Sequence, residues 1–147
     1  NTSVLFAAGA LDGTISAHAY NETSGKLLDR SGTTRVAPLT SGARVSAMTV
    51  HPSGEFVVAS WSDNERHGIS VWRFDRGAFS FGPAYTSETA GAVKALQFTK
   101  GGDRLIAADS KSGVISAFDF VHASGKLQHR VELTRCEAPG AICLTYL

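Results

Sequence analysis

The polar stretch at residues 60–68, with the sequence SWSDNERHG, holds more chemically useful side chains than any other part of this chain. Trp61 offers an apolar plate. The polar groups that follow it are Asp63, Asn64, Glu65, Arg66 and His67. Ligand sites combine apolar walls with a few oriented polar groups, so the stretch predicts recognition of a sugar, a carboxylate or a protein partner. The alternative interpretation is a solvated hairpin loop without a ligand.

Connections elsewhere in the sequence add a second group of candidates, which we expect on the same face as this stretch. Arg44 is the candidate that we assign to ligand binding. Its companions in these connections are Arg35, Tyr85, Glu88 and Arg135. These connections are rich in Ser, Thr and Gly, which favours loops as their structure.

The histidines and cysteines show no pattern of a metal or catalytic motif. The five histidines lack metal-ligand spacing, and no HExxH, GxSxG or P-loop sequence occurs, so we expect no metal and no cofactor. His51 lies in the turn sequence HPSG, where a local hydrogen-bonding role is favoured. Cys136 and Cys143 flank a turn, and they either form a disulfide across it or remain buried thiols.

Two glycosylation sequons give the only indication of a compartment. Asn21 in NET and Asn1 in NTS both fit the acceptor pattern, which favours a secreted or extracellular glycoprotein over a cytoplasmic protein. No apolar run is long enough to span a bilayer, and no signal peptide is visible. The net charge is +1 with basic residues scattered among acids, so we expect neither a nucleic-acid partner nor a membrane partner.

The elements that position these residues are strands. Short runs rich in Val, Ile, Phe, Tyr and Trp alternate with period two and are bounded by Gly, Ser, Asp or Pro. Examples are VSAMTV, EFVVAS, ISVWRF, VKALQF and VISAFDF. No stretch keeps a helical period for three turns, so the sequence predicts an all-β fold.

An internal repeat narrows the fold to a β-propeller. The run GTISAHAYNETSGKLLDR recurs 100 positions later as GVISAFDFVHASGKLQHR, and a third copy between them has a longer insertion, WSDNERH. A unit of about 50 residues with four antiparallel strands is typical of a propeller blade. We assign residues 1–43 to a partial blade with strands two to four. Residues 44–91 and 92–140 form two further blades, and residues 141–147 form the first strand of another.

These blades are too few for a closed ring, which takes at least about four. We therefore expect the chain to belong to a larger ring, because isolated blades expose unpaired edges. The remaining blades come from a second chain or from further copies of this one. The chain is thus the carboxyl-terminal product of a processed precursor, a fragment, or a self-assembling unit.

Three sequence stretches resemble one known family. HPSGEFVVAS, SGVISAFDF followed by SGKL, and HRVEL followed by EAPGAICLTYL look like lactonase-type seven-bladed propellers. The likeness is strongest to the fungal 3-carboxy-cis,cis-muconate lactonizing enzymes, or carboxymuconate cyclases, and the family also includes bacterial 6-phosphogluconolactonase. The resemblance covers nearly all of this chain and corresponds to the last blades of a family member.

The resemblance implies metal-independent chemistry with His, Glu and Arg side chains on one face of the ring. By alignment the family's glutamate falls near Ala10 and an arginine falls near Ser62, and neither residue carries the required group. We therefore expect a ligand- or partner-binding protein in which this chain has not retained the catalytic positions. The alternative is a lactone-forming or lactone-hydrolysing enzyme that a partner chain completes.

Overall fold

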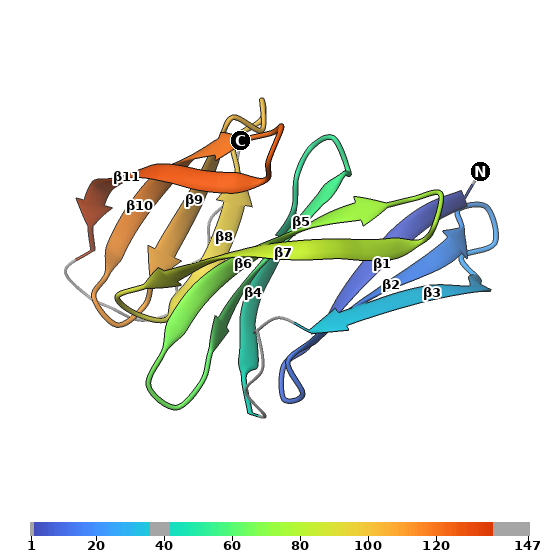
Figure 1. Cartoon of the computed structure of the whole chain (residues 1–147), viewed down its shortest axis with the longest axis horizontal. Coiled ribbons are helices and arrows are strands. Elements are labelled where there is room, and N and C mark those ends of the chain that lie inside the picture. Colours follow the sequence, from blue (N-terminus) through green and yellow to red (C-terminus); the bar gives the residue numbers. More distant parts are fainter. Residues whose placement is uncertain (1, 36–41, 137–147) are drawn as a thin grey trace.

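The part of the chain that the structure describes forms three antiparallel β-sheets. The computed structural model describes residues 2–35 and 42–136, and its sheets follow one another across the molecule (Figure 1). The described residues contain strands, turns and bends but no helix, which confirms the all-β prediction. They therefore include no helix that could cross a membrane.

Each sheet is a set of hairpins in chain order. The first sheet contains β1 (Thr2–Gly9), β2 (Thr14–Asn21) and β3 (Leu27–Arg35). The middle sheet contains β4 (Arg44–Val50), β5 (Phe56–Ser62), β6 (His67–Asp75) and β7 (Ser80–Thr89). The third sheet contains β8 (Val93–Phe98), β9 (Arg104–Asp109), β10 (Val114–Val121) and β11 (Lys126–Arg135). The leading strands β4 and β8 lie next to each other, as do the trailing strands β3 and β7.

The middle sheet is buried on both faces, and the alternation along β5 shows how. Phe56 to Trp61 are all buried. Val57, Ala59 and Trp61 pack into a core shared with the first sheet, whereas Phe56 and Val58 pack into a core shared with the third sheet. Successive side chains of a strand point to opposite faces, so a continuous apolar run is what a doubly covered strand requires.

The same alternation in β6 completes the two cores. Trp72 and Phe74 face the first sheet, and Ile69 and Val71 face the third sheet.

The antiparallel strand order gives the middle sheet two distinct ends. The β5–β6 loop and the β7–β8 connection lie at one end, which we call the β5–β6 end. The β4–β5 and β6–β7 turns lie at the other end, which we call the β6–β7 end.

Several predictions from the sequence lie outside the described residues. They are Asn1 as a glycosylation site, Cys143 as a disulfide partner, and residues 141–147 as a strand.

Candidate functional site

Trp61 belongs to the core and does not form an exposed wall, which corrects the expectation for this residue. It lies in β5 with 2% of its surface exposed. Its Nε1 donates a hydrogen bond of 3.0 Å to Ser70 Oγ. A Cβ added at Gly68 would come within 2.5 Å of the indole ring, so the ring covers that glycine closely. The period-two pattern Val57, Ala59, Trp61 already contained this signal.

The predicted long insertion is not a long loop. The β5–β6 loop comprises residues 63–66, the same length as the loops at 10–13 and 110–113. The additional residues extend the β5–β6 hairpin instead, because Ser62 pairs with His67 and Trp61 pairs with Gly68. Backbone hydrogen bonding favours this outcome, since a longer ladder satisfies groups that a loop would leave to water.

Asp63 and Arg66 form the structural frame of this loop. Asp63 N donates to Arg66 O over 2.9 Å, and Asp63 Oδ1 accepts from Arg66 N over 2.9 Å. Asp63 Oδ2 accepts from both Arg66 Nε and Arg66 Nη2, at 3.1 and 2.8 Å. The guanidinium is therefore already engaged, and a ligand would have to compete with Asp63 for it. Asn64 and Glu65, by contrast, are exposed at the tip of the loop.

Beside the loop, four side chains form a row across the β5–β6 end of the middle sheet. Arg44 is in register with Ser62, Ser62 with His67, and His67 with Thr89. Residues directly opposite in an antiparallel pair share a face, and this face is the one turned toward the third sheet. We call this set the Arg44–Thr89 row. It unites the predicted residues Arg44 and His67 with Ser62, which had been noted only as a family position.

The row combines a cation with a hydroxyl–imidazole pair. Ser62 Oγ lies 2.9 Å from His67 Nδ1, and Arg44 is exposed on the neighbouring strand. Lys94 of β8 adds a second cation near the leading strands, where its Nζ donates to Ser46 Oγ over 3.2 Å. Guanidinium and ammonium groups recognise carboxylate or phosphate, and hydroxyl and imidazole groups orient the oxygens of such a ligand.

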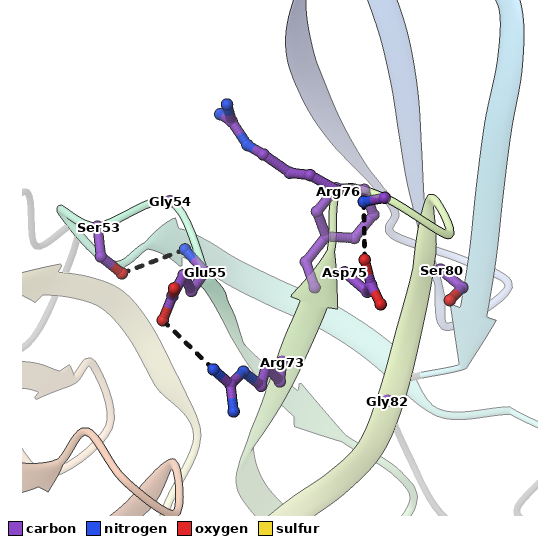
Figure 2. Close-up of a pocket in the computed structure, with 10 residues that line it drawn as sticks. Ser53, Gly54, Glu55, Arg73, Asp75, Arg76, Ser80 and Gly82 are labelled. Atoms are coloured by element: carbon purple, nitrogen blue, oxygen red, sulfur yellow. Dashed lines mark hydrogen bonds and ion pairs between the residues drawn. The ribbon is translucent and has the colours of Figure 1, made fainter.

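A hollow at the opposite, β6–β7 end was not found from the sequence. It is an open groove of about 780 Å³ whose walls include Ser53, Glu55, Arg73 and Asp75. Figure 2 shows Glu55 and Arg73 facing each other across it, with Arg73 Nη2 3.7 Å from Glu55 Oε2. Asp75 Oδ1 accepts from Gly77 N over 2.7 Å, which shapes the β6–β7 turn. In the sequence, these charged residues have the same pattern as residues on an ordinary solvent-exposed face of a sheet. The sequence therefore contains no indication that they line a groove.

Of the described candidates for glycosylation and the disulfide, one belongs to the first sheet and one follows the third, whereas Tyr85 and Glu88 lie within β7, the strand of Thr89. Asn21 ends β2, and its Oδ1 accepts from Thr23 N and Ser24 N at 2.9 and 3.0 Å in an exposed turn. Cys136 follows β11 and is partly buried, and its partner in the predicted disulfide is not described. Within the described residues, no group of three or more His, Cys, Asp or Glu side chains is arranged to hold a metal ion.

His51 occupies the turn predicted for it, but it also joins two sheets. Its Nδ1 accepts from Ser53 N over 3.1 Å, and its Nε2 lies 3.1 Å from Gly102 O in the β8–β9 turn. These partners identify the Nε2–H tautomer, in which Nε2 donates to the carbonyl oxygen. Burial lowers the pKa of His51, so the imidazole is held neutral.

Comparison with known proteins identifies a family model and solved structures that match most of the chain. Residues 1–145 match the model of a family described as lactonase, 7-bladed beta-propeller. No curated protein sequence matches the chain. A "putative 6-phosphogluconolactonase" of Bacteroides fragilis is 18% identical, with a TM-score of 0.73 over 91% of this chain and 36% of its own. The periplasmic gluconolactonase of Pseudomonas aeruginosa is 19% identical, with a TM-score of 0.69 over 88% of this chain and 35% of its own. The chain therefore spans about a third of the length of these structures.

Proposed function

This chain belongs to the lactonase family of seven-bladed β-propellers, and we propose that its middle sheet binds a small polar ligand carrying a carboxylate or phosphate. The observation that carries the proposal is the Arg44–Thr89 row. It aligns a guanidinium, a hydroxyl and an imidazole across neighbouring strands at one end of the sheet. Sites built on strands hold their groups in more constant positions than sites built on loops.

Arg44 is the residue on which ligand binding depends in this proposal. It lies directly opposite Ser62, the position to which the family resemblance assigns an arginine. Arg44 therefore supplies a cation next to this position, from β4 and not from β5. Ser62 and His67 supply hydrogen-bonding groups for a hydroxyl-rich ligand such as a sugar acid or lactone. Asn64 and Glu65 at the exposed loop tip add further polar contacts.

Binding without chemistry is the function that we favour for this chain. Ala10, where the resemblance places the family's glutamate, lies in the exposed β1–β2 loop and has no ionisable group. A general acid or base needs such a group within hydrogen-bonding reach of the substrate. The family's catalytic positions are therefore not retained here, in this proposal, and the row serves recognition.

Calorimetric titration with 6-phosphogluconate and D-gluconate tests this proposal. We expect saturable binding of at least one of them, weakened about fivefold or more in Arg44→Gln, because an anion–guanidinium contact is lost. Arg104→Gln is the matched control, since Arg104 is also an exposed strand arginine and pairs with Asp119 in the third sheet. Absence of binding by the unaltered chain, or equal loss in both variants, would contradict the proposal.

Catalysis is the second candidate, and the Ser62–His67 hydrogen bond favours it. An imidazole bonded to a hydroxyl is the arrangement that activates a nucleophile or a water molecule. In this alternative a lactone is formed or opened by an enzyme whose remaining groups come from other blades. Hydrolysis of glucono-δ-lactone above the spontaneous rate that is lost in His67→Gln would establish it. A rate equal to the spontaneous one, measured with the remaining blades present, would exclude it for this substrate.

The open face of the first sheet supports a proposal for the partner. Leu5 is 50% exposed and Leu27 is 61% exposed, whereas Leu105 and Leu127, 100 positions later, are 0% and 5% exposed. The later pair packs on the middle sheet. We propose that a preceding propeller blade covers the open face in the same way, contributed by a second chain or by further copies of this one.

An extracellular location and a glycan at Asn21 remain proposals. The exposed turn after β2 supports them, because the sequon residues Glu22 and Thr23 are both accessible there. A mass decrease of the naturally produced protein after enzymatic deglycosylation, absent in Asn21→Gln, is the expected result.

A further inference from the structure

We infer a second ligand site, for a small anion attached to a flat apolar group, in the pocket between the middle and third sheets. This pocket has a volume of about 280 Å³. We call it the SGK pocket, and it is lined by Phe56, Val71, Arg73, Pro83, Tyr85, residues 123–125 of the β10–β11 turn, and Lys126 at the start of β11. It lies toward the β6–β7 end, so it is distinct from the Arg44–Thr89 row.

The repeated sequence SGKL contributes the turn of this pocket. Folding accounts for two of its four positions. Gly125 has a φ of 69°, and a Cβ there would lie 3.1 Å from the Phe56 ring, while Leu127 is 5% exposed in the core. Ser124 and Lys126 are exposed, and neither turn geometry nor burial demands a cation at Lys126. Lys126 lines the pocket, and ligand binding is the role that we infer for it.

Two cationic residues line the SGK pocket. They are Lys126 at the start of β11 and Arg73 in β6, the latter with 64% of its side chain exposed. The Arg73 guanidinium carbon lies 5.8 Å from the centre of the Phe56 ring, which holds it over the apolar wall. None of the described residues that line the pocket is an Asp or a Glu. Arg73 also pairs with Glu55, which is not among the lining residues, at 3.7 Å, so an anion in the pocket would share this guanidinium with Glu55. The pocket therefore favours an anion.

The apolar side of the pocket comes from the middle sheet. Val71 and Tyr85 are in register on β6 and β7, next to Phe56 at the start of β5. The Tyr85 hydroxyl donates to Leu127 O over 3.3 Å, which ties this wall to the turn. Aromatic and aliphatic walls with a few polar groups are typical of small-molecule sites. A carboxylate or phosphate on an aromatic or similarly flat body matches both halves of the pocket.

The first sheet provides a natural control, because it contains the same turn without the opposing wall. Gly25 has a φ of 68°, close to that of Gly125, but among the described residues a Cβ there would meet no atom within 4 Å. Lys26 is exposed like Lys126. The two lysines thus share sequence and turn geometry and differ in the sheet that faces them.

Titration of the chain with phenyl phosphate, benzoate, inorganic phosphate and benzyl alcohol, followed by NMR, tests the inference. We expect phenyl phosphate or benzoate to shift the amide signals of Gly125 and Tyr85 in a saturable way. Lys126→Gln and Arg73→Gln should each weaken this binding about fivefold, the upper range for an exposed ion pair, whereas Lys26→Gln should not change it. The two anionic aromatic probes distinguish a phosphate ligand from a carboxylate ligand.

Four results would overturn the inference. The first is no saturable shift with either anionic aromatic probe, and the second is equal weakening in Lys26→Gln and Lys126→Gln. The third is binding of benzyl alcohol as strong as that of phenyl phosphate, which would show that the anion contributes nothing. The fourth is binding of inorganic phosphate as tight as that of phenyl phosphate, which would show that the apolar wall contributes nothing. Because both lysines are exposed, unchanged melting temperatures are expected and confirm that the variants fold.

Discussion

At the scale of single residues, the loop candidates divide into core, frame and accessible groups. Trp61 is core, since its indole is buried and hydrogen-bonded to Ser70. Asp63 and Arg66 form the frame of the loop, because their side chains are bonded to each other. Accessible recognition groups remain at Arg44 and at the exposed tip of the loop. Binding tests based on Trp61 would therefore measure folding rather than recognition.

Trp61→Phe should lower the free energy of unfolding by about 1–3 kcal/mol, because it removes one buried hydrogen bond and part of a packed ring. Trp61→Ala should cost more, about 3–5 kcal/mol. Urea unfolding followed by circular dichroism measures both. Leu133→Ala is the control, since Leu133 is 53% exposed and a surface change there should stay within about 0.5 kcal/mol. An unaltered unfolding midpoint in Trp61→Ala would contradict the core assignment.

At the scale of elements, turns contribute both sheet contacts and ligand groups. The β4–β5 turn places His51 against Gly102 in the β8–β9 turn, and His122 of the β10–β11 turn reaches Glu55 over 3.2 Å. The His51 ring also packs against Phe98 and Phe120, with ring centres 4.8 and 4.9 Å away. This cluster joins the middle and third sheets at the β6–β7 end.

From the burial of His51 we expect the free energy of unfolding to fall in mild acid. Burial first, and the charge of His122 in addition, lower the pKa of His51 below its ordinary value of 6.5, while Gly102 and Glu55 oppose the shift. A lowered pKa means that the unfolded chain binds the proton more readily. The stabilisation from neutral His51 is therefore fully present above about pH 6.5 and is lost as the pH falls toward the folded-state pKa.

Urea unfolding at several pH values from 7.5 to 5 measures this effect, with the variants His51→Gln and His18→Gln compared. We expect the loss of stability on acidification to be smaller in His51→Gln than in the unaltered chain. His18→Gln is the control, because His18 lies opposite the exposed Leu5 on the open face of the first sheet and is not part of the His51 cluster. Equal pH dependence in all three proteins would show that His51 does not carry it.

At the scale of the whole molecule, consecutive sheets pack through unlike faces. The face of the middle sheet that carries Phe56 and Val58 packs on the face of the third sheet that carries Leu105 and Phe118. The equivalent face of the first sheet, which carries Leu5 and Leu27, is open. Association through unlike faces leads to a ring when the rotation closes. Membership of a seven-bladed family agrees with such a ring.

Two leucines at equivalent positions test the role of the open face. Leu27→Ala should change the free energy of unfolding by less than about 0.5 kcal/mol. Leu127→Ala should cost about 2–5 kcal/mol, because it leaves a cavity between two sheets. A fusion that joins a second copy of residues 44–104 directly to Leu5 should supply the missing cover. In that fusion Leu27→Ala should become about as costly as Leu127→Ala, and an effect that stayed near zero would contradict the proposed blade partner.

Much of this architecture could be predicted from the sequence, because the relevant physics is local and repeated. Period-two patterns determined the strands, and the copy at 100 positions identified the repeating sheet. His51 and Gly125 fit their turns because turn residues follow from backbone geometry within a few positions. The chemistry was less predictable. Asp63 and Arg66 appeared as two ligand groups in the sequence, and only their geometry shows that they satisfy each other.

What the sequence by itself determined is the kind of unit: antiparallel strands, their order in a sheet, and the repetition of that sheet. Tertiary structure alone decided which residues come together across strands and sheets: Arg44 lies opposite Ser62, and Arg73 and Lys126 line the same pocket. The physical reason is that register and sheet packing couple residues far apart in the chain. Identical segments at Lys26 and Lys126 consequently acquire different surroundings, and the surroundings, not the segment, determine what each can bind.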